Sequence, residues 1–244
     1  MAAPYLSIVI PAFNEALRIG KALEEVEKYA ASRPFATELI LVDDGSSDST
    51  VDLFRQFQSL WPETRILQNE INRGKGFSVR RGMLEAQGDV ILFTDADLSA
   101  PIEETDKLLR ALESSAADAA VGSRALDRKL IGIHQPWRRE FGGRCFNLFV
   151  RLFTGLNIHD TQCGFKLFRR ATTRKAFELQ RVERFGFDPE VLFLIKRLGG
   201  KIVEVPVRWN DNPATRVHFL RDSTRMFLDL LVLRWRSWGR QNTP

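Results

Sequence analysis

Short apolar segments alternate with longer amphipathic ones through the first half of the chain. The apolar segments are predicted strands, and the stretches between them carry apolar residues at helical spacing. The predicted strands are Leu6 to Ile10, Glu38 to Val42, Arg65 to Leu67, Val90 to Phe93 and Ala117 to Val121. The predicted helices are Asn14 to Ala30, Thr50 to Leu60, Asn72 to Gln87 and Ile102 to Glu113. This alternation predicts an α/β fold with a mainly parallel sheet flanked by helices.

The pattern changes after Arg124, and the second half is expected to elaborate the first. Predicted strands lie at Gly164 to Arg169 and Lys201 to Trp209, and Pro206 suggests that the latter lies at a sheet edge. Predicted helices lie at Pro189 to Leu198 and Asp222 to Trp238. No linker separates the halves, so we expect one domain over residues 1–244, with residues 1–125 and 126–244 as its two halves.

Two carboxylates follow the apolar strand at Val90 to Phe93. Asp95 and Asp97 are separated only by Ala96, and open α/β sheets bind ligands where their strands end. Carboxylates this close repel each other unless a cation lies between them. Mg²⁺ or Mn²⁺ suits oxygen ligands and shares its shell with substrate phosphates. The pair predicts a divalent metal site, and the alternative is a helix cap at Asp97 with a solvated loop acid at Asp95.

Polar residues also follow the first two strands. Asn14-Glu15 and Asp43-Asp44 are expected to line the same crevice as the acidic pair. The first turn, PAFNE, lacks the G-x-G-x-x-G of a dinucleotide-binding turn, so hydride transfer with NAD is not expected. Asp43 can accept hydrogen bonds from a base or a ribose. The alternatives are a helix cap at Asn14 and a turn acid at Asp43.

Composition narrows the class of partner. The 36 Lys and Arg residues against 31 Asp and Glu residues give a net charge of +5, which favours an anionic partner. The arginines are spread through helices without a nucleic-acid-binding module, so nucleic acid is not expected. Cys145 and Cys163 form no Cys/His cluster, which argues against structural zinc and favours reduced thiols. The sequence shows no signal peptide and no apolar run of about 18 residues. We therefore expect that the chain does not cross a membrane by itself. The location that we predict for it is cytoplasmic, peripheral on the inner face of a membrane.

Two amphipathic segments are candidates for contact with that membrane. Arg144 to Ile158 carries Phe146, Phe149 and Phe153 beside basic residues, and Asp222 to Trp238 combines Leu and Phe with Arg and Trp. Basic residues beside interfacial aromatic residues are typical of helices that lie in the headgroup plane. The alternative is that both helices pack on the sheet as ordinary core.

Four motifs in the first 125 residues together resemble the family 2 glycosyltransferases of the GT-A fold. They are PAFNE after the first strand, VDDGSSDST after the second, NRGKG before the third helix, and DADLSAP after the strand at 90–93. The resemblance implies a GT-A fold and a nucleotide diphosphate sugar as donor. It implies that Asp95 and Asp97 hold a metal on the diphosphate. The residues implied to contact the nucleotide are Pro11, Phe13, Glu15, Asp43, Lys75, Asp95 and Ala96.

The second half resembles the polyprenyl-phosphate branch of that family. The motifs that carry this resemblance are Gly122-Ser123-Arg124, Arg138-Arg139, DTQCGFK from Asp160, FDPE from Phe187, and the stretch 216–221. The branch contains dolichyl-phosphate glucosyltransferases and dolichyl-phosphate mannose synthases. DTQCGFK looks closer to the glucosyl branch, which implies UDP-glucose, with GDP-mannose as the next choice. Ser99 stands where mannose synthases usually carry Gln, which also argues against mannose.

The arginines suit a lipid phosphate as acceptor. A phosphate monoester is already anionic and can attack the sugar C1 without a strong base, so the site needs cations to hold it. Arg binds phosphate in bidentate geometry, and each candidate has a solvated surface position as its alternative. The candidates are Arg124, Arg138, Arg139, Arg208 and Arg216.

Acidic and amide side chains of the second half complete the predicted site. Asp160 is expected to position the acceptor or an arginine, and Asp188, Glu190 and Gln162 are expected to contact the sugar. The alternative for Asp188 and Glu190 is a stabilising charge at a helix N-terminus, with Pro189 in the first turn.

The sequence therefore predicts an inverting transfer of a hexose to a polyprenyl or dolichyl phosphate at a membrane surface. Asp95, Asp97, Asp160 and Arg124 are the predicted catalytic residues, and the product would be β-linked. One alternative is a family 2 transferase that acts on a saccharide or other soluble hydroxyl, with Asp160 or Asp188 as general base. Another is a non-catalytic module that binds nucleotide sugars or anionic membranes.

Overall fold

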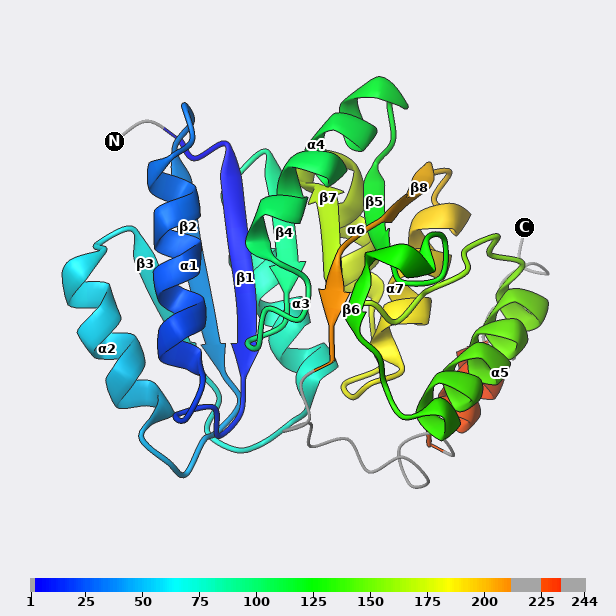
Figure 1. The fold of residues 1–244 in the computed structure, drawn as a ribbon, viewed down its shortest axis with the longest axis horizontal. Helices are drawn as coiled ribbons and strands as arrows, with labels where there is room; N and C mark the ends of the chain where they lie inside the picture. The colour runs from blue at the N-terminus through cyan, green and yellow to red at the C-terminus, as the bar shows by residue number, and fades with distance from the viewer. Residues whose placement is uncertain (1–2, 212–224, 234–244) are drawn as a thin grey trace.

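The computed structural model describes residues 3–211 and 225–233, and a seven-stranded sheet runs through the centre of this part (Figure 1). The strand order is β3-β2-β1-β4-β7-β5-β8. The strands are β1 (Leu6–Ala12), β2 (Thr37–Asp43), β3 (Thr64–Gln68), β4 (Val90–Thr94), β5 (Ala119–Ser123), β7 (Phe165–Arg169) and β8 (Ile202–Pro206). Strand β7 is antiparallel to β4 and β5, and the other paired strands of this sheet run parallel. The predicted α/β fold with a mainly parallel, mixed sheet is confirmed.

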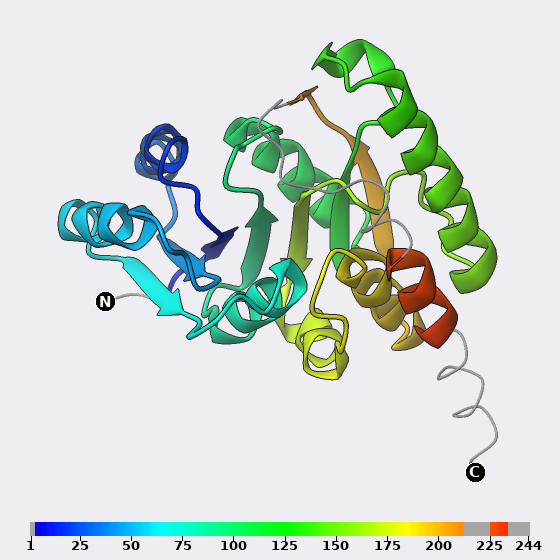
Figure 2. The same ribbon diagram turned by 90° about the horizontal axis from the view of Figure 1, so that it is seen from below.

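Helices cover both faces of the sheet (Figure 2). On one face lie α1 (Ile19–Ala31), α2 (Thr50–Leu60), the short 3₁₀ helix η1 (Ile102–Glu104) and α4 (Thr105–Ser114). On the other lie α3 (Lys75–Glu85), α6 (Arg170–Leu179) and α7 (Phe187–Arg197). Successive residues of β1 enter different clusters, since Ile8 packs with the first set of helices and Val9 with the second. This two-sided burial explains why the strands read as unbroken apolar runs.

Helix α5 (Trp137–Thr154) and the C-terminal helix at residues 225–233 lie side by side at one end of the molecule. The ring of Phe149 meets that of Phe227 edge-on, with centroids 5.5 Å apart. The 3₁₀ helix η2 (Arg128–Leu130) leads into β6 (Ile131–Ile133), which pairs with β9 (Trp209–Asn210) in a separate small sheet. No helix in the described part of the chain combines the length and the apolar character needed to cross a bilayer.

Several predicted boundaries differ from the structure. Helix α1 begins at Ile19 instead of Asn14, because Asn14 has a left-handed backbone (φ 55°) and its side chain is bound to the loop after β2. Helix α6 and the small β6–β9 sheet were not predicted. Strand β8 lies at the edge of the sheet, as Pro206 suggested, but it ends at Pro206 instead of continuing to Trp209. Of the helix predicted from Asp222 to Trp238, residues 225–233 are helical and the remainder lies outside the described residues.

Candidate active site

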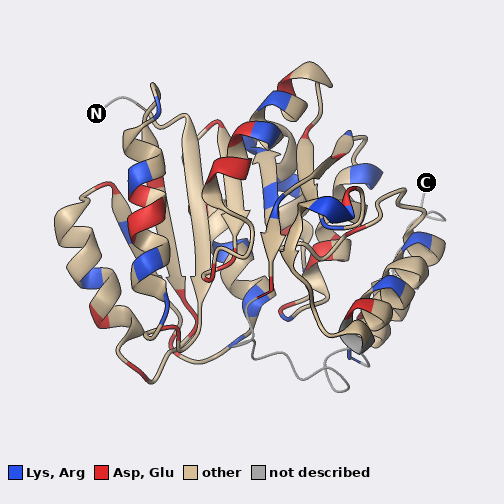
Figure 3. Cartoon of the chain, viewed as in Figure 1, with Lys and Arg blue, Asp and Glu red and all other residues tan. Residues whose placement is uncertain are grey.

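Three strands end together at one edge of the sheet. Ala12 of β1 aligns with Asp43 of β2, and Val9 of β1 aligns with Phe93 of β4. Strands β2 and β3 follow β1 on one side, and β4 pairs with β1 on its other side. The direction in which strands are added to the sheet therefore reverses between β1 and β4. Figure 3 shows acidic residues in the loops at the carboxyl ends of β1 and β2. The polar residues after the three strands therefore meet at one edge of the sheet.

The acidic pair lies at the end of β4. The backbone N–H of Asp95 donates to the carbonyl of Gly164 at 3.1 Å, and a Cβ at residue 164 would collide with the Asp95 carboxylate. Asp97 accepts from the backbone N–H of Ser99 at 3.1 Å. Burial and the neighbouring Asp95 raise the pKa of Asp97. The folded chain thus disfavours the ionised form of Asp97, and a bound cation would favour it.

Two basic side chains already lie against the acidic pair. Lys75 Nζ lies 2.6 Å from Asp95 Oδ1, and Arg18 Nη1 lies 3.9 Å from Asp97 Oδ2. Burial alone lowers the pKa of Lys75, but Asp95 and then Asp188 outweigh burial and the net pKa is raised. Each carboxylate of the pair is therefore partly neutralised by a cation of the chain itself.

The loop after β2 holds the segment that carries Lys75. Asp44 is buried and accepts from the backbone N–H of Gly74 at 2.7 Å and of Arg73 at 3.0 Å. It also accepts from the side chain of Asn69 at 2.8 Å. Asp43 instead binds within its own loop, where it accepts from the backbone N–H of Ser46 at 3.2 Å. The sequence pointed to Asp43 as a ligand-binding residue, but the positioning role of Asp44 was not predicted.

The first turn is tied to the same loop. The Asn14 side-chain oxygen accepts from the backbone N–H of Ser47 at 2.8 Å. The Glu15 carboxylate binds the guanidinium of Arg18, with 2.7 Å between Oε1 and Nη2. Pro11 is buried within β1, Phe13 is half-buried after it, and Ala96 is buried between the two aspartates. Glu15 is thereby linked through Arg18 to the acidic pair.

Arg124 and Asp160 form a bidentate ion pair beyond the end of β5. Arg124 Nε lies 2.7 Å from Asp160 Oδ2, and Arg124 Nη2 lies 2.8 Å from Oδ1. Burial alone would raise the pKa of Asp160, but Arg124 outweighs it and the pKa is lowered. The Arg124 guanidinium also lies 5.2 Å from the centroid of the Trp209 ring. Asp160 thus holds Arg124 in one orientation, and the segment from Asp160 to Gly164 passes beside Asp95.

A second ion pair lies deeper in the protein. Lys166 Nζ lies 2.5 Å from Asp188 Oδ1, and the Lys166 side chain is only 2% exposed. Lys166 also donates to the carbonyl of Cys163 at 2.5 Å. Burial raises the pKa of Asp188, although Lys166 and Lys75 oppose this effect. Acidic and basic side chains therefore alternate in this part of the protein, in the order Asp95, Lys75, Asp188 and Lys166. The ion pair of Lys166 was not predicted, because the sequence around Lys166 is apolar.

The other predicted residues make separate contacts. Glu190 accepts from the backbone N–H of Val182 at 2.7 Å and stabilises the loop before α7. Gln162 donates to the Met226 sulfur at 3.7 Å. Arg208 Nε lies 2.5 Å from Glu104 Oε1. Arg138 and Arg139 lie in the first turn of α5, and Arg216 lies outside the described residues.

Residues 3–211 and 225–233 contain no group of three or more His, Cys, Asp or Glu side chains arranged to hold a metal ion. Asp95 and Asp97 could therefore supply only part of a coordination shell. Mg²⁺ and Mn²⁺ sites that use one or two carboxylates are usually completed by substrate phosphates and water. The two aspartates fit that kind of shared site.

Comparison with known proteins finds relatives over most of the chain. Residues 7–177 match the family model "Glycosyl transferase family 2". The chain is 38% identical to a dolichyl-phosphate beta-glucosyltransferase of Drosophila melanogaster over 241 residues, which cover 93% of this chain and 74% of that protein. It is 34% identical to the protein of that name from Saccharomyces cerevisiae, covering 94% of this chain and 74% of the relative.

A solved structure shares the fold. Glucosyl-3-phosphoglycerate synthase of Mycobacterium tuberculosis, crystallised with Mn²⁺, uridine diphosphate and glucosyl-3-phosphoglycerate, superimposes with a TM-score of 0.69. The two chains are 18% identical, and the match covers 95% of this chain and 80% of that one. The predicted GT-A fold is confirmed by this likeness.

Proposed function

This chain belongs to glycosyl transferase family 2, and from that membership we propose that it transfers glucose from a nucleotide diphosphate sugar to a dolichyl-type polyprenyl phosphate. The observation that carries the proposal is the similarity to relatives named for this reaction, which extends over 93% of the chain. The similarity therefore includes the half that we assign to the acceptor, residues 126–244, as well as the half that we assign to the donor, residues 1–125.

We assign the nucleotide sugar to the carboxyl ends of β1, β2 and β4. UDP-glucose is the expected donor, supported by the names of the relatives and by the uridine diphosphate bound in the mycobacterial enzyme of the same fold. GDP-mannose is the next candidate. Phe13 and Asp43 would contact the base and ribose, with Pro11, Glu15 and Ala96 around them, and Lys75 would reach the diphosphate.

We assign a divalent cation, Mg²⁺ or Mn²⁺, to Asp95 and Asp97. The raised pKa of Asp97 supports this, because burial and Asp95 disfavour its charge in the absence of such an ion. The mycobacterial enzyme of the same fold was crystallised with Mn²⁺. Bound there, the ion would neutralise charge on the departing nucleoside diphosphate. Lys75 lies close enough to add a second positive charge beside that leaving group.

We assign the acceptor phosphate to Arg124 first. Asp160 engages its Nε and Nη2, so Nη1 remains to donate toward a phosphate while the guanidinium stays fixed. Arg138 and Arg139 of α5, Arg208 and Arg216 are further candidates for phosphate contact. We assign the sugar to Asp188, which Lys166 holds, and to Gln162. Glu190, the other predicted sugar contact, instead binds the backbone of the loop before α7 and faces the groove on the far side of that loop.

The proposed chemistry needs no strong base. The second pKa of a phosphate monoester is about 6, so the acceptor is largely a dianion near neutral pH. Its oxygen would attack C1 of the sugar from the face opposite the diphosphate and give a β-linked product. Asp160 acts in this proposal by positioning Arg124, in agreement with its ion pair, and removes no proton.

A lipid acceptor requires a membrane-facing surface, and we propose that α5 and the C-terminal helix provide it. One face of α5 is core, since Phe146 and Val150 are buried. The opposite face presents apolar side chains to solvent, including Leu148 (55% exposed) and Leu152 (71% exposed). Such a face beside Arg144 and Arg151 suits a helix lying in the headgroup plane. The protein would be peripheral on the cytoplasmic face of its membrane.

The test is a direct assay of the purified chain with a short-chain polyprenyl phosphate in detergent. UDP-glucose and GDP-mannose are compared with and without Mn²⁺, and the lipid product is identified by mass and by the proton coupling at its anomeric carbon. The expected result is a β-linked glucosyl phosphate lipid that requires the metal. Transfer to a soluble hydroxyl in preference to the lipid, or donor binding without turnover on any acceptor, would overturn the proposal.

A further inference from the structure

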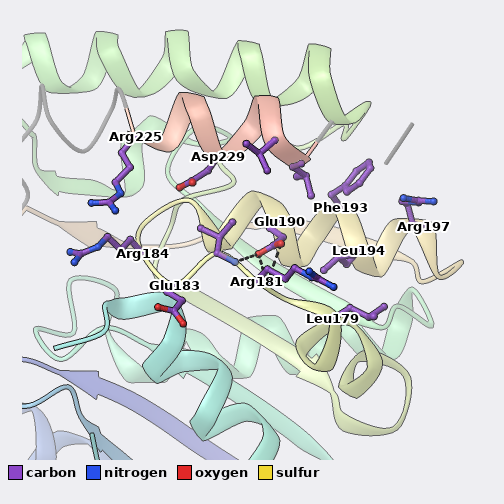
Figure 4. A pocket seen from close by; sticks show the side chains of 13 residues that line it. Leu179, Arg181, Glu183, Arg184, Glu190, Phe193, Leu194, Arg197, Arg225 and Asp229 are labelled. Atoms are coloured by element: carbon purple, nitrogen blue, oxygen red, sulfur yellow. Dashed lines mark hydrogen bonds between the residues drawn. The ribbon is translucent and has the colours of Figure 1, made fainter. Parts of the chain in front are cut away.

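A groove of about 620 Å³ lies between α7 and the C-terminal helix (Figure 4). Its apolar walls are Phe193 and Leu194 of α7 and Val232 and Leu233 of the C-terminal helix. The loop at 181–186 closes one side. The Asp229 carboxylate rests on this loop, because a Cβ at Gly186 would approach Asp229 Oδ2 to 2.8 Å. The groove is thus an apolar channel bounded by a tightly packed loop.

Guanidinium groups lie along this channel. Arg184 and Arg225 lie at the same end of the groove, and Arg197 lies at the other (Figure 4). None of these three side chains forms an ion pair with a carboxylate at 4.0 Å or less among the described residues. One end of the groove therefore carries two positive charges that lack a close carboxylate.

The acids of the groove do not balance those charges. Glu183 binds Arg73, outside the groove, and Glu190 accepts the backbone N–H groups of Arg181 and Val182. Burial raises the pKa of Asp229, which Arg225 only partly offsets. The groove therefore combines an apolar channel with a cationic end, which is the chemistry that recognises an amphiphilic anion.

The groove opens beside the surface that we assign to the membrane. Leu228 and Leu231 of the C-terminal helix are 54% and 39% exposed, and Val232, which lines the groove, is 42% exposed. The same helix packs on α5 through Phe227 and Phe149. A lipid in the cytoplasmic leaflet of that membrane could enter the groove from the side, with its phosphate at the depth of the arginines.

The structure separates the groove from the acidic pair. The loop at 181–186 packs with its other side on the start of α3, where a Cβ at Gly76 would come within 2.6 Å of the Val182 carbonyl. A Cβ at Gly74 would come equally close to the Glu183 carbonyl. The groove thus lies behind the wall of the donor site, and Arg124 belongs to a different ion pair.

We propose that this groove binds an anionic phospholipid of the membrane, with the headgroup phosphate between Arg184 and Arg225 and an acyl chain along Phe193 and Val232. The proposal rests on the membrane placement given under the proposed function, and it adds a second lipid site to the acceptor site at Arg124. Because the loop at 181–186 also packs on α3, an occupied groove stabilises the wall of the donor site.

The first test measures binding of the full chain to vesicles by co-sedimentation. Vesicles of phosphatidylcholine alone are compared with vesicles that also contain phosphatidylserine. The double variant Arg184→Gln, Arg225→Gln should lose about thirtyfold of the serine-dependent affinity, which corresponds to about 2 kcal/mol for two basic residues near an anionic surface. The charge-preserving variant Arg184→Lys, Arg225→Lys separates a built site from diffuse attraction. Binding by the Lys variant equal to that of the wild type would overturn the proposal.

Arg55→Gln is the matched control, because Arg55 lies on α2 at the other end of the sheet and is exposed. A second measurement uses soluble short-chain phosphatidylserine and inorganic phosphate in thermal unfolding. The phospholipid should raise the Tm of the wild type but not of the Gln double variant. Equal stabilisation by inorganic phosphate would show that the groove recognises the phosphate alone, which contradicts a lipid site.

Kinetics distinguish this site from the acceptor site. With a short-chain polyprenyl phosphate in detergent, the Gln double variant should keep the wild-type KM for the acceptor. A raised acceptor KM with unchanged vesicle binding would assign the groove to the acceptor and overturn the proposal. Failure of the wild type to form any glucosyl lipid would instead refute the proposed function, and the vesicle and Tm measurements would still decide whether the groove binds phospholipid.

Discussion

Replacement of Lys75 by Met should strengthen the binding of Mn²⁺ to the protein in the absence of nucleotide. Lys75 Nζ lies 2.6 Å from Asp95 Oδ1, in the position that a cation bound by Asp95 would contest. In the wild type, a metal ion must displace this ammonium group before Asp95 can become a ligand. Met keeps most of the apolar stem of the side chain and removes the ammonium group.

The magnitude follows from the geometry of the pair. A hydrogen bond to a charged group contributes about 1.5–3 kcal/mol. The Lys75 and Asp95 side chains are 23% and 34% exposed, so solvent screening favours the lower end of that range. A change of about 1.4 kcal/mol is tenfold in affinity. The Kd for Mn²⁺ alone should therefore fall about tenfold in Lys75→Met.

Bound nucleotide should reduce the difference in Mn²⁺ affinity between the wild type and Lys75→Met. In the wild type, a bound diphosphate can take over the Lys75 ammonium, which frees Asp95 for the metal, so UDP and Mn²⁺ should each tighten the binding of the other. Coupling of this kind is reciprocal. In Lys75→Met the ammonium is gone, so UDP should enhance Mn²⁺ binding less than it does in the wild type.

The assay measures the concentration of free Mn²⁺ by electron paramagnetic resonance, with and without UDP, and does not require catalytic turnover. Lys107→Met is the matched control, because Lys107 lies 2.6 Å from Glu104 and is 37% exposed but has no contact with the acidic pair. If Mn²⁺ alone binds Lys75→Met no more tightly than the wild type, Lys75 does not compete with the metal. The pairing with Asp95 would then have no bearing on metal binding.

Three further predictions follow from the ion pairs. Arg124→Gln should raise the KM for the lipid phosphate roughly tenfold or more and leave the KM for the nucleotide sugar within about twofold; equal changes in both would remove Arg124 from the acceptor site. Lys166→Met should lower the free energy of unfolding by about 3–5 kcal/mol in urea titrations, because Asp188 would stay buried without its partner. The double variant Lys166→Met, Asp188→Asn should recover part of that loss. The pKa of Glu104 is lowered because Lys107 and Arg208 outweigh the effect of burial. The ionised Glu104 side chain therefore stabilises the fold above the unfolded pKa of about 4.5, and this stabilisation is lost as pH falls through the lower folded pKa. Glu104→Gln should therefore flatten the fall in Tm at acidic pH, and an unchanged profile would contradict the lowered pKa.

The strand-end residues were predictable from the sequence because they depend on local order. Parallel strands end at the same edge of their sheet, so Asp43 and Asp95 had to lie at one edge once β2 and β4 were recognised as parallel strands. The start of α1 was not predictable in the same way. Asn14 resembles a helix cap in the sequence, but its side chain bonds to Ser47, a residue that the chain brings back only after β2.

The partners of the charged residues could not be predicted, because they depend on where β7 inserts. Alternating strands and helices indicated parallel neighbours, whereas β7 enters between β4 and β5 in the antiparallel direction. Lys166 pairs with Asp188 only in that arrangement. In the sequence, Lys166 stands within an apolar strand, where a basic residue would be expected to face solvent at an edge.

The direction of β7 also explains why residues from both halves of the chain lie at one edge of the sheet. In an antiparallel pair the end of one strand lies beside the start of the other, and Thr94 of β4 aligns with Phe165 of β7. The residues before β7 must therefore lie beside the residues after β4. A parallel strand in this place would have carried its preceding segment, from Asp160 to Gly164, to the opposite edge of the sheet. The antiparallel insertion thus brings Asp160 to the edge at which β4 and β5 end, where it pairs with Arg124 after β5. An acceptor phosphate held by Arg124 would meet the proposed donor at that edge.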